Sequence, residues 1–161
     1  MRQTDKLTFA MGCFWGPEDR FARLPGVTGT RVGYAGGESE TPSYRRLGGH
    51  SEAVEVEFDP GEISLEELLE RFWSEHNPEA VEGYKPDDSR YRSLLFYRDE
   101  RQRAAMERAR RVMQERGRNS RATRLLPLGA FYPAEEKHQR YEEKKRRKTK
   151  AGRRPENGNE A

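Results

Sequence analysis

The sequence has one cysteine among its 161 residues. A single thiol cannot form a disulfide within the chain, and this sparing use of cysteine is typical of a reducing compartment. The sequence also has no apolar run long enough to span a membrane, and its start lacks the apolar core of a signal peptide. We therefore expect a soluble cytoplasmic protein without a membrane partner, and we expect a monomer.

Clustered metal ligands and a phosphate-binding glycine loop are also absent from the sequence. The three histidines, His50, His76 and His138, are scattered and do not have the spacing of a ligand set. No glycine-rich loop of the kind that cradles a phosphate follows a predicted strand. We expect neither a bound metal nor a bound nucleotide cofactor.

Hydrophobic residues are scarce, at 32% of the chain, whereas charged residues make up 37%. Residues 142–161 hold eight basic and four acidic side chains, which leaves 23 basic and 24 acidic side chains in residues 1–141. The net charge of +3 therefore describes the end of the chain and not the surface of the rest. We expect one domain over residues 1–141 and a basic, disordered tail over residues 142–161.

The basic run at residues 144–154 raises the alternative of a nucleic-acid-binding module. This run has no interleaved aromatic side chains. The bases of a bound nucleic acid commonly stack on such side chains. A tail of this kind binds phosphate weakly and with strong salt dependence. Nucleic acid is therefore not an expected partner.

The hydrophobic pattern predicts strands and helices in alternation. Strands are expected near residues 7–11, 27–34, 52–58, 91–97 and 121–128, and helices at about residues 17–24, 64–76, 99–116 and 133–145. This order favours a two-layer α/β sandwich over an all-α or all-β fold. The polar segment between the second and third strands is predicted to be an irregular surface loop.

The cysteine, Cys13, lies at a predicted junction between a strand and a helix. Residues 7–11 predict a short buried strand, and Pro17 suits the first turn of a helix. The free backbone N–H groups and the dipole at a helix start favour a thiolate, so we predict a lowered pKa for Cys13. The alternative is an inert packing residue, because free cysteines are among the most buried residues.

Glu52 has the parity of the apolar face of its strand. Alternation places Val54, Val56 and Phe58 on one face of the strand, and Glu52 falls on the same face. Burial would raise the pKa of this carboxyl group and make it a proton donor near neutral pH. The alternative is that Glu52 lies at a frayed strand end and reaches solvent.

Several short motifs occur in order along the chain. They are Gly12-Cys13-Phe14-Trp15-Gly16, Leu24-Pro25-Gly26-Val27, Gly33-Tyr34-Ala35-Gly36-Gly37, Pro42-Ser43-Tyr44, Gly49-His50-Ser51-Glu52-Ala53-Val54, Phe58-Asp59-Pro60, Tyr91-Arg92-Ser93 and Phe131-Tyr132-Pro133-Ala134-Glu135. This ordered set resembles the peptide methionine sulfoxide reductase A family over about residues 6–141. The resemblance implies a ferredoxin-like α/β fold and the thiol-dependent reduction of methionine (S)-sulfoxide, free or in proteins, as in the repair of oxidised proteins.

The resemblance also implies how the reaction is divided among side chains. Cys13 is implied as the nucleophile on sulfur, and a protonated Glu52 as the proton donor for the departing oxygen. Tyr44 and Tyr91 correspond to family tyrosines that donate hydrogen bonds to the sulfoxide oxygen.

Three further positions are implied in substrate binding. Phe14 and Trp15 correspond to the wall around the substrate methyl group, although packing in the core is the alternative for both rings. The family usually has an aspartate, then a glycine and a glutamine, before its Tyr-Arg-Ser motif, whereas here the preceding segment is shorter by one residue. We expect Asp87 to take the place of the family aspartate, with Asp88 as the alternative and a surface turn as the other interpretation of both.

The oxidised cysteine must be reduced again after each turnover. The implied product is a sulfenic acid on Cys13, which many relatives resolve with further cysteines near the C-terminus. This chain has none, so we expect an external thiol reductant, either a small-molecule thiol or a thioredoxin- or glutaredoxin-type protein.

A cysteine hydrolase is the alternative enzyme class. His50 could serve as the base for Cys13 in acyl transfer. The sequence offers no recognisable third member of such a site, so the reductase is the favoured hypothesis.

Overall fold

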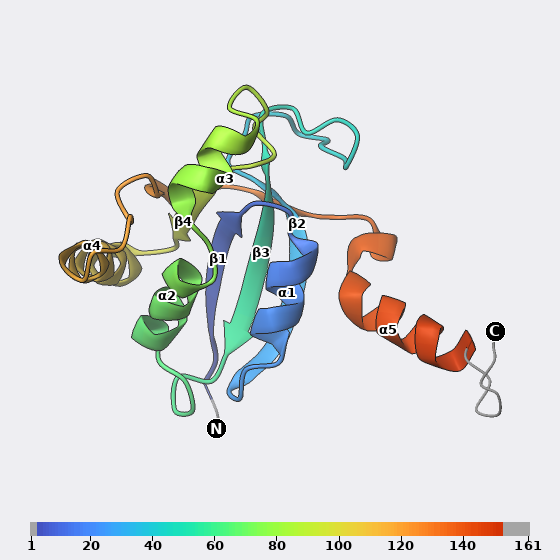
Figure 1. Ribbon diagram of the computed structural model, residues 1–161, viewed down its shortest axis with the longest axis horizontal. Helices are drawn as coiled ribbons and strands as arrows, with labels where there is room; N and C mark the ends of the chain where they lie inside the picture. Colours follow the sequence, from blue (N-terminus) through green and yellow to red (C-terminus); the bar gives the residue numbers. More distant parts are fainter. Residues whose placement is uncertain (1–2, 153–161) are drawn as a thin grey trace.

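A six-stranded mixed sheet organises the fold, and a computed structural model describes it for residues 3–152 (Figure 1). The strands are β1 (Asp5–Met11), β2 (Val27–Ala35), β3 (Ser51–Phe58), β4 (Ser93–Tyr97), β5 (Arg124–Pro127) and β6 (Phe131–Pro133). Their order across the sheet is β5-β4-β1-β3-β2-β6. Four of the strand pairs are antiparallel, and the β4–β5 pair is parallel.

Five α-helices accompany the sheet in the described residues. They are α1 (Trp15–Ala22), α2 (Leu65–Ser74), α3 (Pro78–Tyr84), α4 (Glu100–Glu115) and α5 (Tyr141–Gly152), with a 3-10 turn at Glu136–His138. In Figure 1, α1 and α2 lie across one face of the central strands. The predicted α/β fold is confirmed, and the structure shows that its sheet is mixed.

The core under α1 and α2 is centred on β1, which pairs with β3 on one side and β4 on the other. Phe9 of β1 is fully buried, and its ring lies 4.7 Å from that of Phe21 in α1 and 5.5 Å from that of Phe72 in α2, between centroids. Burial of each such side chain stabilises the fold by about 1.5–3 kcal/mol. One strand residue therefore fixes both helices, and with α1 it fixes the loop that carries Cys13.

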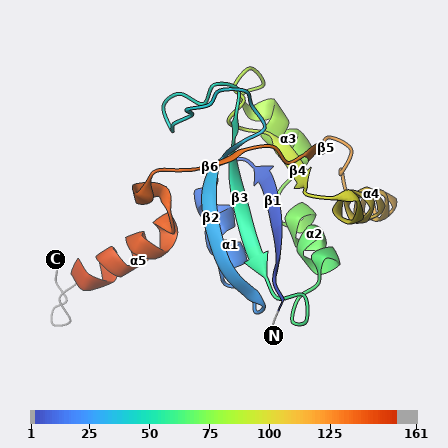
Figure 2. The same ribbon diagram turned by 180° about the vertical axis from the view of Figure 1, so that it is seen from behind.

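An extended segment, and no helix of residues 3–152, crosses the opposite face of the sheet near one end of the strands (Figure 2). Alanines at positions 10, 35 and 53 are fully buried on this face, beside Leu94 and Phe96. Small side chains let the segment around Leu126 and Phe131 pack close to the strands. The chain thereby crosses from β5 at one edge to β6 at the other, which brings the C-terminal segment to the strand that borders the candidate site.

Two helix starts have side-chain caps, but only one has the full reciprocal capping box. Ser64 and Glu67 form the full reciprocal capping box at the start of α2. Asp99 accepts the backbone N–H of Gln102 at the start of α4. The Gln102 side chain accepts the N–H of Arg98 and donates to the carbonyl of Lys6, so it does not return to the Asp99 backbone.

The structure corrects the predicted C-terminal region. Residues 142–152 form most of α5 and are not disordered, and the predicted helix from residue 133 is replaced by β6, the 3-10 turn and a reversal at Arg140, whose φ is 52°. Contacts with α1 hold this helix: the Tyr141 ring stacks on Trp15, and both terminal nitrogens of Arg146 donate to the Asp19 carboxylate, at 2.9 and 3.0 Å. Residues 153–161 of the predicted tail lie outside the described residues. Helix α3 was not predicted, although Asn77 and Pro78 form its start.

Candidate active site

Cys13 lies between the end of β1 and the start of α1. The preceding residue, Gly12, has a φ of 104°, a left-handed conformation that glycine adopts without strain. This turn lets the chain leave the sheet at Met11 and begin the helix at Trp15. Cys13 is exposed. An exposed thiol in this turn does not fit the alternative of an inert packing residue.

The pKa of the Cys13 thiol is raised, so the prediction of a lowered pKa is wrong. Although the residue reaches solvent, partial burial of its side chain disfavours the thiolate and is the largest cause. The negative charge of Glu52 acts in the same direction. The backbone N–H of Trp15 and the charge of Arg90 favour the thiolate, as expected at a helix start, but they do not offset burial.

Glu52 points into the protein, and the alternative of a solvent-exposed strand end is wrong. The side chain is 1% exposed, and its Oε1 accepts the backbone N–H of Phe14 at 2.9 Å. Its Oε2 accepts a guanidinium N–H of Arg90 at 2.7 Å. Burial raises the pKa of this carboxyl group and outweighs the two hydrogen bonds, both of which lower it. The buried acid therefore adjoins the residue after Cys13.

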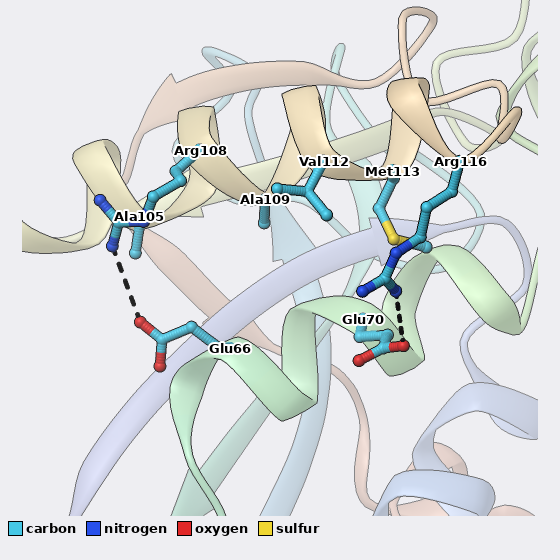
Figure 3. Close-up of a pocket in the computed structure, with 8 residues that line it drawn as sticks. All are labelled: Glu66, Glu70, Ala105, Arg108, Ala109, Val112, Met113 and Arg116. Carbon is cyan, nitrogen blue, oxygen red and sulfur yellow. Dashed lines mark hydrogen bonds and ion pairs between the residues drawn. The ribbon is translucent and has the colours of Figure 1, made fainter.

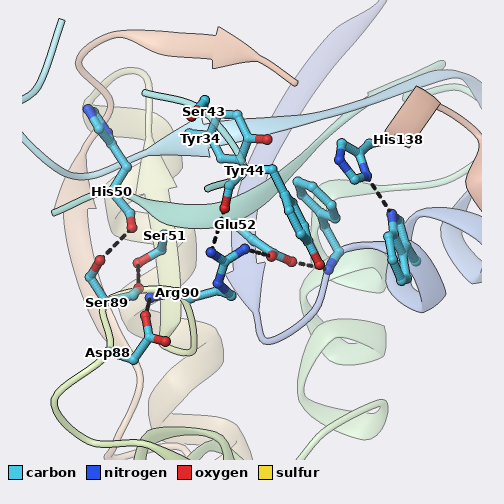
Figure 4. Close-up of polar contacts among 12 residues, drawn as sticks. Tyr34, Ser43, Tyr44, His50, Ser51, Glu52, Asp88, Ser89, Arg90 and His138 are labelled. Atoms are coloured by element: carbon cyan, nitrogen blue, oxygen red, sulfur yellow. Dashed lines mark hydrogen bonds and ion pairs between the residues drawn. The ribbon is translucent and has the colours of Figure 1, made fainter. Parts of the chain in front are cut away.

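Arg90 joins Glu52 to Tyr44 in the candidate site and was not predicted from the sequence (Figure 4). One guanidinium nitrogen donates to Glu52, and the other donates to the backbone carbonyl of Tyr44 at 2.5 Å. The guanidinium carbon lies 4.5 Å from the centroid of the Tyr44 ring. The only signal was the break in the family pattern before Tyr91, where a cation replaces a neutral side chain.

Of the two neighbouring aspartates, Asp88 lies beside the site. Its Oδ1 accepts the backbone N–H of Arg90 at 2.9 Å, and its charge contributes to the raised pKa of Glu52. Asp87 is exposed, and both aspartates line an open hollow of about 560 Å³. Asp88 therefore contacts Arg90 of the candidate site, and the role expected of Asp87 stays a prediction.

An aromatic cluster adjoins Cys13 on the α1 side. The rings of Trp15 and Tyr141 stack with centroids 3.9 Å apart, and those of Tyr44 and His138 stack at 4.3 Å. The indole N–H of Trp15 donates to Nδ1 of His138 at 3.2 Å, and Phe14 packs 5.8 Å from the same imidazole. Phe14 is 1% exposed, whereas Trp15 is half-buried.

The C-terminal members of this cluster, His138 and Tyr141, were not predicted as site residues. Because Nδ1 of His138 accepts a hydrogen bond, the proton of the neutral ring is on Nε2, a buried atom without a partner in the described part of the chain. Buried Glu18 fixes this segment by accepting the backbone N–H of Arg140 at 2.8 Å.

Tyr44 and Tyr91 both lie near Glu52. Burial raises the pKa of each phenol, and the charge of Glu52 is the next cause in both cases. The Tyr91 ring packs edge-on against Tyr84 with centroids 5.2 Å apart. Neither the Tyr44 nor the Tyr91 hydroxyl has a hydrogen-bond partner among residues 3–152. Both hydroxyls can therefore donate to a bound oxygen atom.

Both ring nitrogens of His50 form hydrogen bonds with backbone groups, and His50 does not form a pair with Cys13. Its Nδ1 accepts the N–H of Gly37 at 2.9 Å, and its Nε2 donates to the carbonyl of Ser39 at 2.8 Å. The side chain is 2% exposed. With both ring nitrogens occupied, His50 has no free atom to act as a general base, which argues against the hydrolase alternative.

A separate groove lies between α2 and α4, away from Cys13 (Figure 3). Its volume is about 210 Å³. Ion pairs between Arg108 and Glu66 and between Arg116 and Glu70 span it, at 3.8 and 3.0 Å. It contains none of the predicted site residues. Over residues 3–152 no group of side chains is suited to hold a metal ion, and no helix there is long and apolar enough to cross a membrane.

Comparison with known proteins adds an independent line of evidence. A family model described as peptide methionine sulfoxide reductase matches residues 5–160. The chain is 46% identical over 151 residues to "Peptide methionine sulfoxide reductase MsrA" of Methanothermobacter thermautotrophicus. The alignment covers 89% of each chain. The chain is 43% identical over 148 residues to the MsrA of Methanosarcina acetivorans, which covers 88% of this chain and 79% of the relative.

Solved structures show the same likeness. Reduced Mxr1 from Saccharomyces cerevisiae superposes with a TM-score of 0.80 at 32% identity, covering 88% of this chain and 86% of Mxr1. Methionine sulfoxide reductase A of Corynebacterium diphtheriae gives a TM-score of 0.72 at 32% identity, with coverage of 88% and 74%.

Proposed function

Because the chain belongs to the peptide methionine sulfoxide reductase family, we propose that it reduces methionine (S)-sulfoxide, free or in proteins, to methionine. The observation that carries this proposal is the pairing of an exposed Cys13 with a buried Glu52, whose carboxyl group accepts the N–H of Phe14. A nucleophile for sulfur and a proton source for oxygen thereby meet at the start of one helix.

The proposed reaction transfers oxygen from the substrate sulfur to Cys13. The Cys13 sulfur attacks the sulfoxide sulfur, and Glu52 supplies the proton that the sulfoxide oxygen needs in order to leave. The attack forms a transient S–S bond, and this bond and the S–O bond of the substrate break as an S–OH bond forms on Cys13. The substrate sulfur is reduced by two electrons and Cys13 is oxidised by two, which leaves methionine and a Cys13 sulfenic acid.

The tyrosines and the aromatic cluster would orient the substrate for this step. Tyr44 and Tyr91 can donate hydrogen bonds to the sulfoxide oxygen, where negative charge develops, and each is worth about 2–4 kcal/mol by analogy with other oxyanion donors. Phe14 and Trp15 offer aromatic faces to the methyl group next to the polarised sulfur. Asp88 is the better candidate than Asp87 for the acidic residue facing the substrate, because it contacts Arg90.

An external thiol would complete the cycle, because the chain has no second cysteine. A small-molecule thiol or a thioredoxin- or glutaredoxin-type protein would attack the sulfenic sulfur and release water. The relative Mxr1 has been solved in complex with Trx2. Repair of oxidised proteins in the cytoplasm is the proposed role, and both the cytoplasmic location and the monomeric state stay predictions.

Mass spectrometry of the intact protein tests this scheme. One equivalent of methionine (S)-sulfoxide should add about 16 Da to the reduced protein, the mass of one oxygen, and addition of a small thiol should convert this species into a mixed disulfide or return the original mass. Cys13→Ser is the matched control and should show neither change. Unchanged mass of the wild-type protein, with no methionine formed, would contradict the proposed chemistry.

A further inference from the structure

Arg90 and Glu52 form a largely desolvated ion pair inside the candidate site. Their side chains are 16% and 1% exposed, and the nitrogen–oxygen distance is 2.7 Å. Removal of one partner from such a pair leaves the other charge buried without compensation. The charge on Arg90 is therefore a strong local influence on where protons bind.

The resting arrangement places hydrogen-bond donors at both carboxyl oxygens of Glu52. Oε1 faces the N–H of Phe14 and Oε2 faces the guanidinium group, so this arrangement fits an ionised carboxylate. The reaction proposed above needs a proton on Glu52 and a thiolate on Cys13. The proton count is the same for a Cys13 thiol with a Glu52 carboxylate as for a Cys13 thiolate with a protonated Glu52.

We propose that Arg90 is a positioning residue that sets where the proton shared by Cys13 and Glu52 resides. This inference rests on the proposed reductase function. In the substrate-free protein the guanidinium group holds Glu52 as a carboxylate, and the proton stays on the Cys13 sulfur. When the sulfoxide oxygen approaches Glu52, the hydrogen bond from Arg90 to Oε2 breaks. The proton then moves from the thiol through Glu52 to the sulfoxide oxygen. No proton is taken from solvent, and the products are methionine and the sulfenic acid.

The groups that face Glu52 come from four parts of the chain. They are Cys13 before α1, Tyr34 of β2, Tyr44 of the β2–β3 loop, and Asp88, Arg90 and Tyr91 before β4. Arg90 is the cation of this set. Its charge lowers the pKa of both Cys13 and Glu52, so its removal should raise both together.

The pH dependence of kcat/KM tests this role. Coupled groups give a bell-shaped profile whose two limbs belong to the pair, so Arg90→Gln should move both limbs to higher pH by about one unit or more. Arg90→Lys keeps the charge and should keep the profile near that of the wild type. Arg31→Gln is the matched control, because Arg31 pairs with Glu55, which points to the opposite face of β3, and its profile should not move.

Alkylation of Cys13 by iodoacetamide gives a second measurement that needs no turnover. Its rate follows the thiolate, so the midpoint of its pH profile should rise in Arg90→Gln by the same shift. A uniform loss of kcat/KM at every pH, with an unchanged alkylation midpoint, would indicate a merely structural role and overturn the inference. If the wild type reduced no sulfoxide, the proposed function would fail, and a shifted alkylation midpoint would still support the effect of Arg90 on the thiol.

Discussion

The ring of Tyr141 lies 3.9 Å from the indole ring of Trp15, between centroids, with 13° between the two planes. This stack joins the first residue of α5 to the first residue of α1. It covers one side of the ring proposed to contact the substrate methyl group. The C-terminal segment therefore forms part of the candidate binding wall.

Substitution Tyr141→Ala should raise KM for methionine (S)-sulfoxide several-fold while kcat changes little. Loss of the stack frees the Trp15 ring, and an aromatic contact of this kind is worth about 0.5–1.5 kcal/mol. Steady-state kinetics would measure the effect. Tyr141→Phe keeps the stack and is the control, so an equal rise of KM in both variants would disprove the stacking argument.

Substitution Glu52→Gln should lower kcat by about two orders of magnitude, the contribution of a positioned proton donor. The amide oxygen of glutamine can still accept the Phe14 N–H, so the fold should be retained, which circular dichroism would check. Glu55→Gln is the control, since Glu55 points to the other face of β3 and pairs with Arg31. A kcat for Glu52→Gln within twofold of the wild type would remove Glu52 from the mechanism.

His76 should make the fold less stable in mild acid. Its Nδ1 donates to the carbonyl of Phe72 at 2.7 Å, its Nε2 accepts from Ser93 at 2.8 Å, and burial lowers its pKa to about 4. Above the ordinary pKa of 6.5 the ring is neutral in both the folded and the unfolded state and has no effect. Below it the unfolded state binds the proton first, so the free energy of unfolding should fall by up to about 3 kcal/mol toward pH 4.

Urea unfolding of the wild type and His76→Gln, at several pH values in this window, measures the effect. For each protein the free energy of unfolding is plotted against pH. Other titrating groups act equally in both proteins, so the difference between the two slopes isolates His76. The variant should show the flatter slope. Parallel slopes would show that His76 does not stay neutral in the folded protein.

Deletion of residues 145–161 should leave sulfoxide reduction within about threefold of the full chain. The deletion removes the ion pair between Arg146 and Asp19, and exposed pairs of this kind contribute little to stability. Tyr141 stays fixed through the hydrogen bond from Arg140 to buried Glu18. Kinetics of the truncated chain would decide the matter, and loss of activity would show that α5 is needed as a whole.

The sequence predicts well those features that depend on local pattern. Strand parity predicts the inward direction of Glu52, and a glycine before Cys13 is compatible with the sharp turn that the structure has there. Capping residues predict the start of α2 at Ser64. Each of these depends on neighbours within a few positions along the chain.

Features that depend on distant contacts were not predicted. Arg90 contacts Glu52 from 38 positions away along the chain, and Arg146 contacts Asp19 from 127 positions away. The local charge pattern therefore predicts neither the ion pair in the site nor the formation of α5. The thiol pKa of Cys13 was assigned the wrong direction for the same reason. A helix start is visible in the sequence, but the burial and the nearby carboxylate that outweigh it are not.

Turnover of the two separated epimers of methionine sulfoxide is the most direct test of the proposed function. Each epimer would be offered to the wild type and to Cys13→Ser with dithiothreitol, glutathione or thioredoxin as the reductant. We expect the wild type to form methionine from the S epimer alone with at least one of these thiols, and Cys13→Ser to form none. Equal rates on both epimers, or full activity of Cys13→Ser, would contradict the account.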